Sequence, residues 1–216
     1  MHHLKKLNLF FLIGLISWLP ASNTDIFYNN VSGVIFITGD NGIGSGVIIS
    51  NDGHILTNWH VIEDNPNLNA LTLGEGDYDE NLRDLELIKY DPKRDLALLK
   101  LKTIPKNVSV IKISKVVQEV GERVHAIGHP RGEMWSYTMG YISAFREGYT
   151  WKDTEHNREF SGDVYQMQTP INPGNSGGPL LNEHGNLIGL NIFGYTNSQN
   201  ITFAVTVKEI ISFLAS

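Results

Sequence analysis

The chain of 216 residues contains 41% hydrophobic residues, 17 Lys and Arg, 23 Asp and Glu, and no Cys. This length and hydrophobic content suit a two-lobed domain with a substantial core and argue against an intrinsically disordered chain. The formal net charge of −6 argues against nucleic acid and anionic membranes as partners, and the absence of Cys excludes disulfides.

Residues 1–22 differ in composition from the rest of the chain. Lys5 and Lys6 precede the apolar run 7–19, and the segment Pro20-Ala21-Ser22 follows it. This order predicts a secretory signal peptide over 1–22. A membrane anchor is the alternative, but the run is shorter than the roughly 20 residues that cross a bilayer. We therefore expect an exported protein, periplasmic or secreted, with no stable membrane association after cleavage of the signal peptide.

Short β-rich segments separated by Gly, Asn, Asp and Pro follow along the chain. The first two, 31–38 and 46–50, flank the turn-forming residues 39–42 and predict a hairpin. Regular short strands of this kind favour an all-β sandwich or barrel. Strong helical periodicity occurs only at the end, in 207–214. Further strands are predicted at 54–58, 71–73, 85–90, 96–101, 124–128, 138–144, 163–168, 187–193 and 201–205.

Three separated motifs supply His, Asp and Ser in that order. They are TNWHVI (57–62), RDLALLK (94–100) and GNSGGPL (174–180). In the third motif Ser176 lies among glycines, just before an apolar strand-like run. Glycines allow positive φ and close backbone approach, so a tight turn here can direct two backbone N–H groups to a point beside the Ser hydroxyl. For this heptad alone, an ordinary Gly/Pro-rich loop is the alternative.

With these motifs the chain resembles the trypsin-like serine proteases, most closely their bacterial, disulfide-free HtrA (Deg) branch. The segments GSGVIISNDGHILTN (44–58) and QTPINPG (168–174) also resemble that branch. The resemblance implies an all-β fold of two six-stranded antiparallel β-barrels followed by a C-terminal α-helix. We expect one protease domain over 23–216, with barrels at about 27–114 and about 120–206 and the helix at about 207–215.

The resemblance also implies a catalytic triad. A Ser hydroxyl is a weak nucleophile near neutral pH, so it needs a base, and an acid that orients the base. Similar proteases use the residue matching His60 as the general base and acid, the residue matching Asp95 to orient it, and the residue matching Ser176 as the nucleophile. The backbone N–H groups of Gly174 and Ser176 would form the oxyanion hole. In isolation His60 suits a surface or core position, and Asp95 suits the closing of a turn.

The resemblance also bears on specificity, because in similar proteases the residues before the nucleophile line the primary pocket. The matching segment Pro170-Ile171-Asn172-Pro173 carries no acid, which disfavours cleavage after Lys or Arg. By the resemblance, Ile171 and Ile201 would wall the primary pocket and favour small or medium aliphatic side chains. Core packing of both isoleucines is the alternative.

Two other histidines raise the question of a metal site. His125 and His129 lack the spacing of a zinc-binding pair on a helix, and no Cys supports them. We therefore expect no metal and no organic cofactor. His129 and Trp59 occupy positions where the family commonly has Asn or small polar residues, and both are expected to reshape the cleft.

The sequence allows two roles for each of two further segments. The polar segment 148–162 is predicted to be a solvated loop, with regulation of the oxyanion hole as the weaker hypothesis. Phe27 and Tyr28 are similar to the aromatic residues that trimerise HtrA units, so a homotrimer is expected. An aromatic pair that caps the first barrel is the alternative.

The sequence therefore predicts an exported serine endopeptidase that cleaves unfolded or exposed polypeptides in quality control outside the cytoplasm. The alternative is a catalytically latent peptide-binding or chaperone-like module on the same fold. Because the chain ends at Ser216, we expect no PDZ domain and no PDZ-dependent activation.

Overall fold

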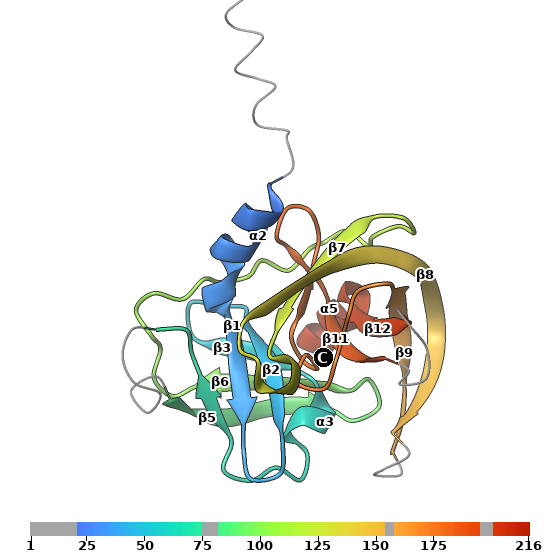
Figure 1. Cartoon of the computed structure of the whole chain (residues 1–216). Coiled ribbons are helices and arrows are strands. Elements are labelled where there is room, and N and C mark those ends of the chain that lie inside the picture. The colour runs from blue at the N-terminus through green and yellow to red at the C-terminus, as the bar shows by residue number, and fades with distance from the viewer. Residues whose placement is uncertain (1–20, 75–81, 154–157, 195–200) are drawn as a thin grey trace, which may run out of the picture.

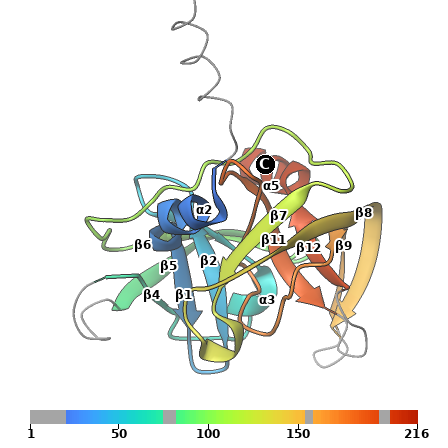
Figure 2. The same ribbon diagram turned by 45° about the horizontal axis from the view of Figure 1, so that its top comes forward.

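The computed structural model describes residues 21–74, 82–153, 158–194 and 201–216. Within these ranges the chain folds into two closed antiparallel β-barrels that lie side by side (Figures 1 and 2). The predicted all-β fold with two six-stranded barrels and a C-terminal helix is confirmed. Most of the predicted signal peptide lies outside the described residues.

The first barrel has the strand order β1-β2-β3-β6-β5-β4. Its strands are β1 (Val34–Thr38), β2 (Ile43–Ile48), β3 (His54–Thr57), β4 (Asn69–Leu71), β5 (Leu82–Asp91) and β6 (Leu96–Leu101). The second barrel has the order β10-β11-β12-β9-β8-β7. Its strands are β7 (Arg123–Gly128), β8 (Ser136–Asp153), β9 (Arg158–Met167), β10 (Pro179–Leu181), β11 (Leu187–Gly194) and β12 (Thr202–Thr206).

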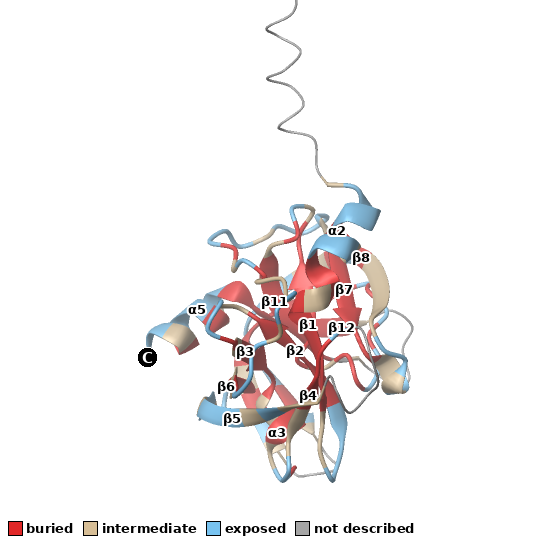
Figure 3. Cartoon of the chain, turned by 90° about the vertical axis from the view of Figure 1, so that its left-hand side faces the viewer, coloured by how far each residue is buried: buried red, intermediate tan, exposed pale blue. Residues whose placement is uncertain are grey.

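Several strands of the first barrel are buried on both faces. Ile35 and Ile37 of β1 belong to the cluster inside the first barrel, whereas Val34 belongs to a cluster that also contains Leu181 and Phe203 of the second barrel. Successive side chains of a strand point to opposite faces. One face of β1 therefore packs inside the first barrel, and the other face packs at the junction of the two barrels. Figure 3 shows the buried residues concentrated along the strands in the middle of the molecule.

The structure also contains short helices that the sequence analysis did not predict. Helix α2 (Asn23–Asn30) precedes a 3₁₀ turn, η1 (Val31–Gly33), and two short helices, α3 (Trp59–Ile62) and η2 (Pro130–Gly132), follow along the chain. The start of α2 is a capping box in which Ser22 and Asp25 satisfy each other's backbone N–H groups. This signal is present in the sequence at the end of the segment predicted to be cleaved.

The prediction of a solvated loop over 148–162 is also wrong where the structure describes it. Strands β8 and β9 continue through this segment as a long hairpin, with Trp151 opposite Phe160. Both aromatic side chains are buried, and their rings stack with centroids 5.6 Å apart. Residues 154–157 lie outside the described residues. The prediction failed because most residues of the segment are polar or charged, and polarity alone does not show that Trp151 and Phe160 are buried.

Helix α5 (Val207–Ala215) closes the second barrel through one apolar face. Val207, Ile210 and Phe213 are buried at a spacing of three residues, whereas Ile211 is 43% exposed. Residues three and four positions apart share a helix face, so the helix covers the barrel with one stripe of side chains.

This placement of α5 predicts that replacing two neighbouring isoleucines by alanine changes the free energy of unfolding by different amounts. Ile210→Ala should lower the free energy of unfolding by about 2–5 kcal/mol, because a fully buried side chain is lost and a cavity remains. Ile211→Ala should change it by no more than about 0.5 kcal/mol. Urea unfolding of both variants measures the difference. Equal destabilisation by the two substitutions would contradict this placement of α5.

Candidate active site

His60 and Asp95 are brought together by the pairing of β3 with β6. Thr57, the last residue of β3, is opposite Ala97 of β6, so the residues just after Thr57 lie near those just before Ala97. His60 lies in the first turn of α3, three residues after β3. Asp95 immediately precedes β6 and has a positive φ of 57°.

The His60 and Asp95 side chains form a close pair. Asp95 is fully buried, and its Oδ2 lies 2.7 Å from His60 Nδ1 while its Oδ1 accepts the His60 backbone N–H at 2.9 Å. The Asn58 side chain donates to the Asp95 carbonyl at 2.9 Å. Because a carboxylate can only accept, Nδ1 carries the ring proton and Nε2 is left with a lone pair.

The charge of Asp95 decides the protonation behaviour of His60. Burial alone lowers the pKa of this imidazole, but the attraction and the hydrogen bond of Asp95 outweigh burial, so the pKa is raised above its ordinary value. His60 therefore becomes neutral, and able to accept a proton at Nε2, only when the pH exceeds this raised pKa.

The loop that carries Ser176 rests directly on the first barrel. Ser45 of β2 donates its backbone N–H to the Ser176 carbonyl at 2.8 Å. Gly177 has a φ of +80°, and a Cβ there would overlap both the Thr57 hydroxyl and the Ser45 carbonyl oxygen. Only glycine fits this position. The residue after Ser176 thus touches the segment that leads into His60.

Ser176 itself is hydrogen-bonded to the second barrel. Its Oγ donates to the carbonyl of Ile192 in β11 at 2.6 Å. His60 Nε2 makes no hydrogen bond to any of the described residues. The structure therefore assembles the His60–Asp95 pair completely and places Ser176 in the loop facing that pair, with the hydroxyl held by β11.

Two backbone N–H groups of the Ser176 turn, those of Gly174 and Ser176, have no partner among the described residues. The Pro173 carbonyl accepts the Arg131 N–H at 2.7 Å, and in a trans peptide the N–H of the next residue points the opposite way. The N–H of Gly174 is thus directed away from Arg131. Neither Gly174 nor Ser176 donates its N–H to an acceptor within the described ranges. Two free donors on one turn can bind a developing negative charge.

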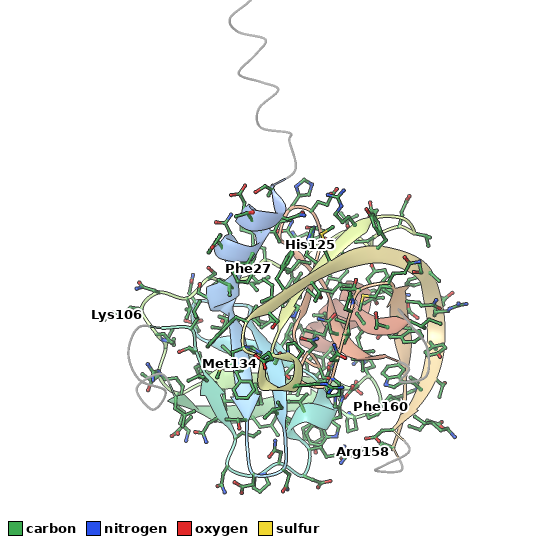
Figure 4. All side chains as sticks on the ribbon, in the orientation of Figure 1. Phe27, Lys106, His125, Met134, Arg158 and Phe160 are labelled. Atoms are coloured by element: carbon green, nitrogen blue, oxygen red, sulfur yellow. The ribbon has the colours of Figure 1, made fainter. Side chains whose placement is uncertain are left out.

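The β8–β9 hairpin from the second barrel closes the site beside His60, which the sequence did not predict. Arg158 forms ion pairs with Glu63 at 2.7 Å and Asp64 at 2.9 Å, just after α3. The Phe160 ring meets the His60 ring edge-on, with centroids 6.4 Å apart. Figure 4 shows Arg158 and Phe160 on the side of the hairpin near α3.

The two isoleucines of the predicted pocket flank one glycine of β11. The carbonyl oxygens of Ile171 and Ile201 lie 3.6 and 3.4 Å from the position of a Cβ on Gly194. Ile171 is 8% exposed and Ile201 is half-buried, and both pack against the apolar core. The segment 195–200 between Gly194 and Ile201 lies outside the described residues.

His125 and His129, the two histidines considered for a metal site, have different surroundings. His125 Nδ1 is 2.7 Å from the Tyr137 hydroxyl. His129 is buried and contacts the rings of Phe36 and Trp135. In the part of the chain that the structure describes, no three His, Asp or Glu side chains form a group that could hold a metal ion.

A His–Asp pair with a buried carboxylate on one barrel, opposite a glycine-rich serine turn on the other, is the arrangement that defines the trypsin-like peptidases. Residues 44–190 match the family model described as the trypsin-like peptidase domain. The chain belongs to this family.

Curated relatives are bacterial and plant serine proteases. The chain is 36% identical over 177 residues to the probable periplasmic serine endoprotease DegP-like of Pseudomonas putida (strain GB-1), which covers 78% of this chain and 33% of the relative. It is 33% identical over 210 residues to protease Do-like 1, chloroplastic, of Arabidopsis thaliana, covering 86% and 45%. The chain thus spans less than half the length of either relative.

Solved structures have the same fold. The serine endoprotease from Yersinia pestis superposes with a TM-score of 0.73 at 29% identity, covering 91% of this chain and 66% of that one. The active form of the Rv3671c protease from M. tuberculosis superposes with a TM-score of 0.78 at 22% identity, covering 91% and 86%. At 22% identity, the similarity to the M. tuberculosis protease supports the fold alone.

The His60–Asp95 geometry predicts the effect of removing one charge. In Asp95→Asn the burial of the imidazole is no longer opposed by a carboxylate, so the pKa of His60 should fall from above its ordinary value to below it. Histidine-selective NMR titration of both proteins measures the two values. An unchanged His60 pKa in a folded Asp95→Asn protein would show that Asp95 does not control the imidazole.

Proposed function

We propose that this chain is an exported serine endopeptidase of the HtrA-like type, which hydrolyses peptide bonds of unfolded or exposed polypeptides. The observation that carries the proposal is the His60–Asp95 pair, with its buried carboxylate, opposite the Ser176 turn, whose two N–H donors have no acceptor among the described residues. Membership of the trypsin-like peptidase family supports the same chemistry.

The proposed mechanism begins with a rotation of Ser176. The hydroxyl leaves the Ile192 carbonyl and turns to His60 Nε2, which accepts no hydrogen bond from the residues that the structure describes. As Oγ attacks the substrate carbonyl, Nε2 takes the hydroxyl proton, and Asp95 holds Nδ1–H and stabilises the imidazolium. His60 then gives the proton to the leaving amine, and an acyl-enzyme remains on Ser176. Water, activated by the same nitrogen, hydrolyses the acyl-enzyme.

Gly174 and Ser176 are proposed to stabilise the tetrahedral intermediate. Their N–H groups would donate to the negatively charged oxygen that replaces the substrate carbonyl. One such donor typically contributes about 2.7–4 kcal/mol to the transition state. The φ of +99° at Gly174 supports this role, since residues with a side chain rarely adopt that conformation.

Export and polypeptide substrates are proposed from the relatives and the sequence together. The bacterial relatives are named as periplasmic endoproteases, and the apolar run 7–19 has the composition of a signal peptide. We therefore propose a periplasmic or secreted location. No helix in the described ranges is long and apolar enough to span a membrane.

The homotrimer stays a prediction. Tyr28 is 70% exposed on α2, while the Phe27 ring packs against Tyr137 with centroids 6.0 Å apart. One aromatic residue of the pair is therefore available to a partner, and the other holds α2 on the second barrel.

A catalytically latent peptide-binding module is the second candidate. The observation that favours it is the hydrogen bond from Ser176 Oγ to Ile192, which leaves the hydroxyl away from His60. A protein that kept this arrangement when peptide binds would hold the peptide without cleaving it.

Labelling of Ser176 separates the two candidates. A fluorophosphonate should modify the wild-type protein and not Ser176→Ala, and only the wild type should cleave casein. His60→Ala should lower kcat by about 10⁴-fold or more, because the nucleophile loses its base. Peptide binding without label or cleavage in the folded wild type would support the latent module instead.

The primary pocket is proposed to accept small or medium aliphatic side chains, because Ile171 and Ile201 flank Gly194 and the segment 170–173 carries no acid. Sequencing of the products from a peptide library should show cleavage after residues such as Ala or Val, and little after Lys or Arg. Cleavage mainly after basic residues would contradict this pocket.

A further inference from the structure

The Ser45 side chain links the first barrel to the glycine before Ser176. Ser45 Oγ donates to the Gly174 carbonyl at 2.7 Å, and the same oxygen lies 2.8 Å from His129 Nδ1. Ser45 and His129 are both fully buried. A carbonyl only accepts hydrogen bonds, so the single hydroxyl proton of Ser45 lies toward Gly174. His129 Nδ1 must then carry a proton and donate it to Ser45 Oγ.

His129 keeps this form over a wide range of pH. Burial lowers the pKa of the imidazole to about 3, so the ring is neutral in mildly acidic and neutral solution. The ring packs against Phe36 and Trp135, whose ring centroids are 5.2 and 5.4 Å away. Nε2 has no hydrogen-bond partner among the described residues. The aromatic contacts fix the ring plane, and the neutral ring has one N–H, which faces Ser45.

Gly174 is consequently held on both sides. The peptide before it is fixed by the hydrogen bond from the Arg131 N–H to the Pro173 carbonyl, and the peptide after it by Ser45. A Cβ on Gly174 would overlap the His129 carbonyl oxygen, so the backbone lies against the β7 end as well. Rotating the peptide that carries the Gly174 N–H breaks the Arg131 hydrogen bond, and moving Gly174 as a whole breaks the Ser45 hydrogen bond.

We propose that Ser45 and His129 are positioning residues that hold the Gly174 N–H toward the carbonyl oxygen of the substrate. The chain of hydrogen bonds runs from His129 Nδ1–H to Ser45 Oγ–H and on to the Gly174 carbonyl. Neither side chain touches the substrate, and both act through the orientation of Gly174. This inference rests on the proposed peptidase function.

The test compares Ser45→Ala, His129→Leu, His129→Asn and the double variant Ser45→Ala/His129→Leu by peptide hydrolysis. Loss of an oxyanion-hole donor costs about 10²–10³ in kcat, and a misdirected donor should cost about tenfold or more. We expect Ser45→Ala and His129→Leu to lose kcat by about this factor with KM changed less than about twofold. His129→Asn retains an N–H donor near the Nδ1 position and should keep most of kcat.

The double variant tests whether His129 acts through Ser45. Once the Ser45 hydroxyl is gone, His129→Leu should cost little further kcat, because the link between the imidazole and Gly174 is already broken. A purely structural role predicts that kcat falls, KM rises and the melting temperature falls together, with no rescue by His129→Asn. Unchanged kcat in folded Ser45→Ala, or full additivity of the two losses, would overturn the proposal.

An activity-independent measurement separates failure of this inference from failure of the proposed function. Histidine-selective ¹⁵N NMR should show a neutral His129 with the proton on Nδ1 at pH 7, and its Nδ1 resonance should move in Ser45→Ala. A wild-type protein with no Ser176-dependent labelling would overturn the peptidase function. A His129 Nδ1 signal that is unprotonated, or unaffected by Ser45→Ala, would overturn the hydrogen-bond chain whether or not the protein is active.

Discussion

The close contact between the Ser176 loop and β2 is the constraint on which the site depends. The backbone of Gly177 lies against the Ser45 carbonyl and the Thr57 hydroxyl with no room for a side chain, and the Ser45 N–H binds the Ser176 carbonyl. Each contact joins the two barrels. Because Thr57 also leads into His60, a single set of contacts places the loop of one barrel at the His–Asp pair of the other.

Packing behind the loop makes this contact rigid. Val34, Val47 and Leu56 of the first barrel share an apolar cluster with Leu190 and Phe203 of the second, and all five are buried. The polar groups at the junction are therefore held in a dry environment, where hydrogen bonds and charge interactions are stronger than in water. The raised pKa of His60 and the lowered pKa of His129 both arise here, and they differ because only His60 has a carboxylate as its partner.

Much of the fold was predictable from the sequence, because short strands bounded by turn residues are typical of barrels. The strand predicted at 96–101, for example, has the same bounds as β6. The candidate residues His60, Asp95 and Ser176 could be picked out because each stands in a distinctive local motif. The contacts of Ser45 and Phe160 could not be predicted, because they join residues far apart in the sequence: Ser45 to His129 and Gly174, and Phe160 to His60. Arg158 lies among charged residues that resemble a solvated loop, and only its ion pairs with Glu63 and Asp64 reveal the closed hairpin.

The most direct test of the account is a crystal structure of the protein with a peptide boronic acid, which forms a tetrahedral adduct with an activated serine. The account predicts a bond from boron to Ser176 Oγ, with one boronate oxygen about 2.7–3.1 Å from the backbone nitrogens of Gly174 and Ser176. Ser45 Oγ should still be bound to the Gly174 carbonyl. An adduct whose oxygen lies away from both nitrogens, or a peptide bound beside an unmodified Ser176, would contradict it.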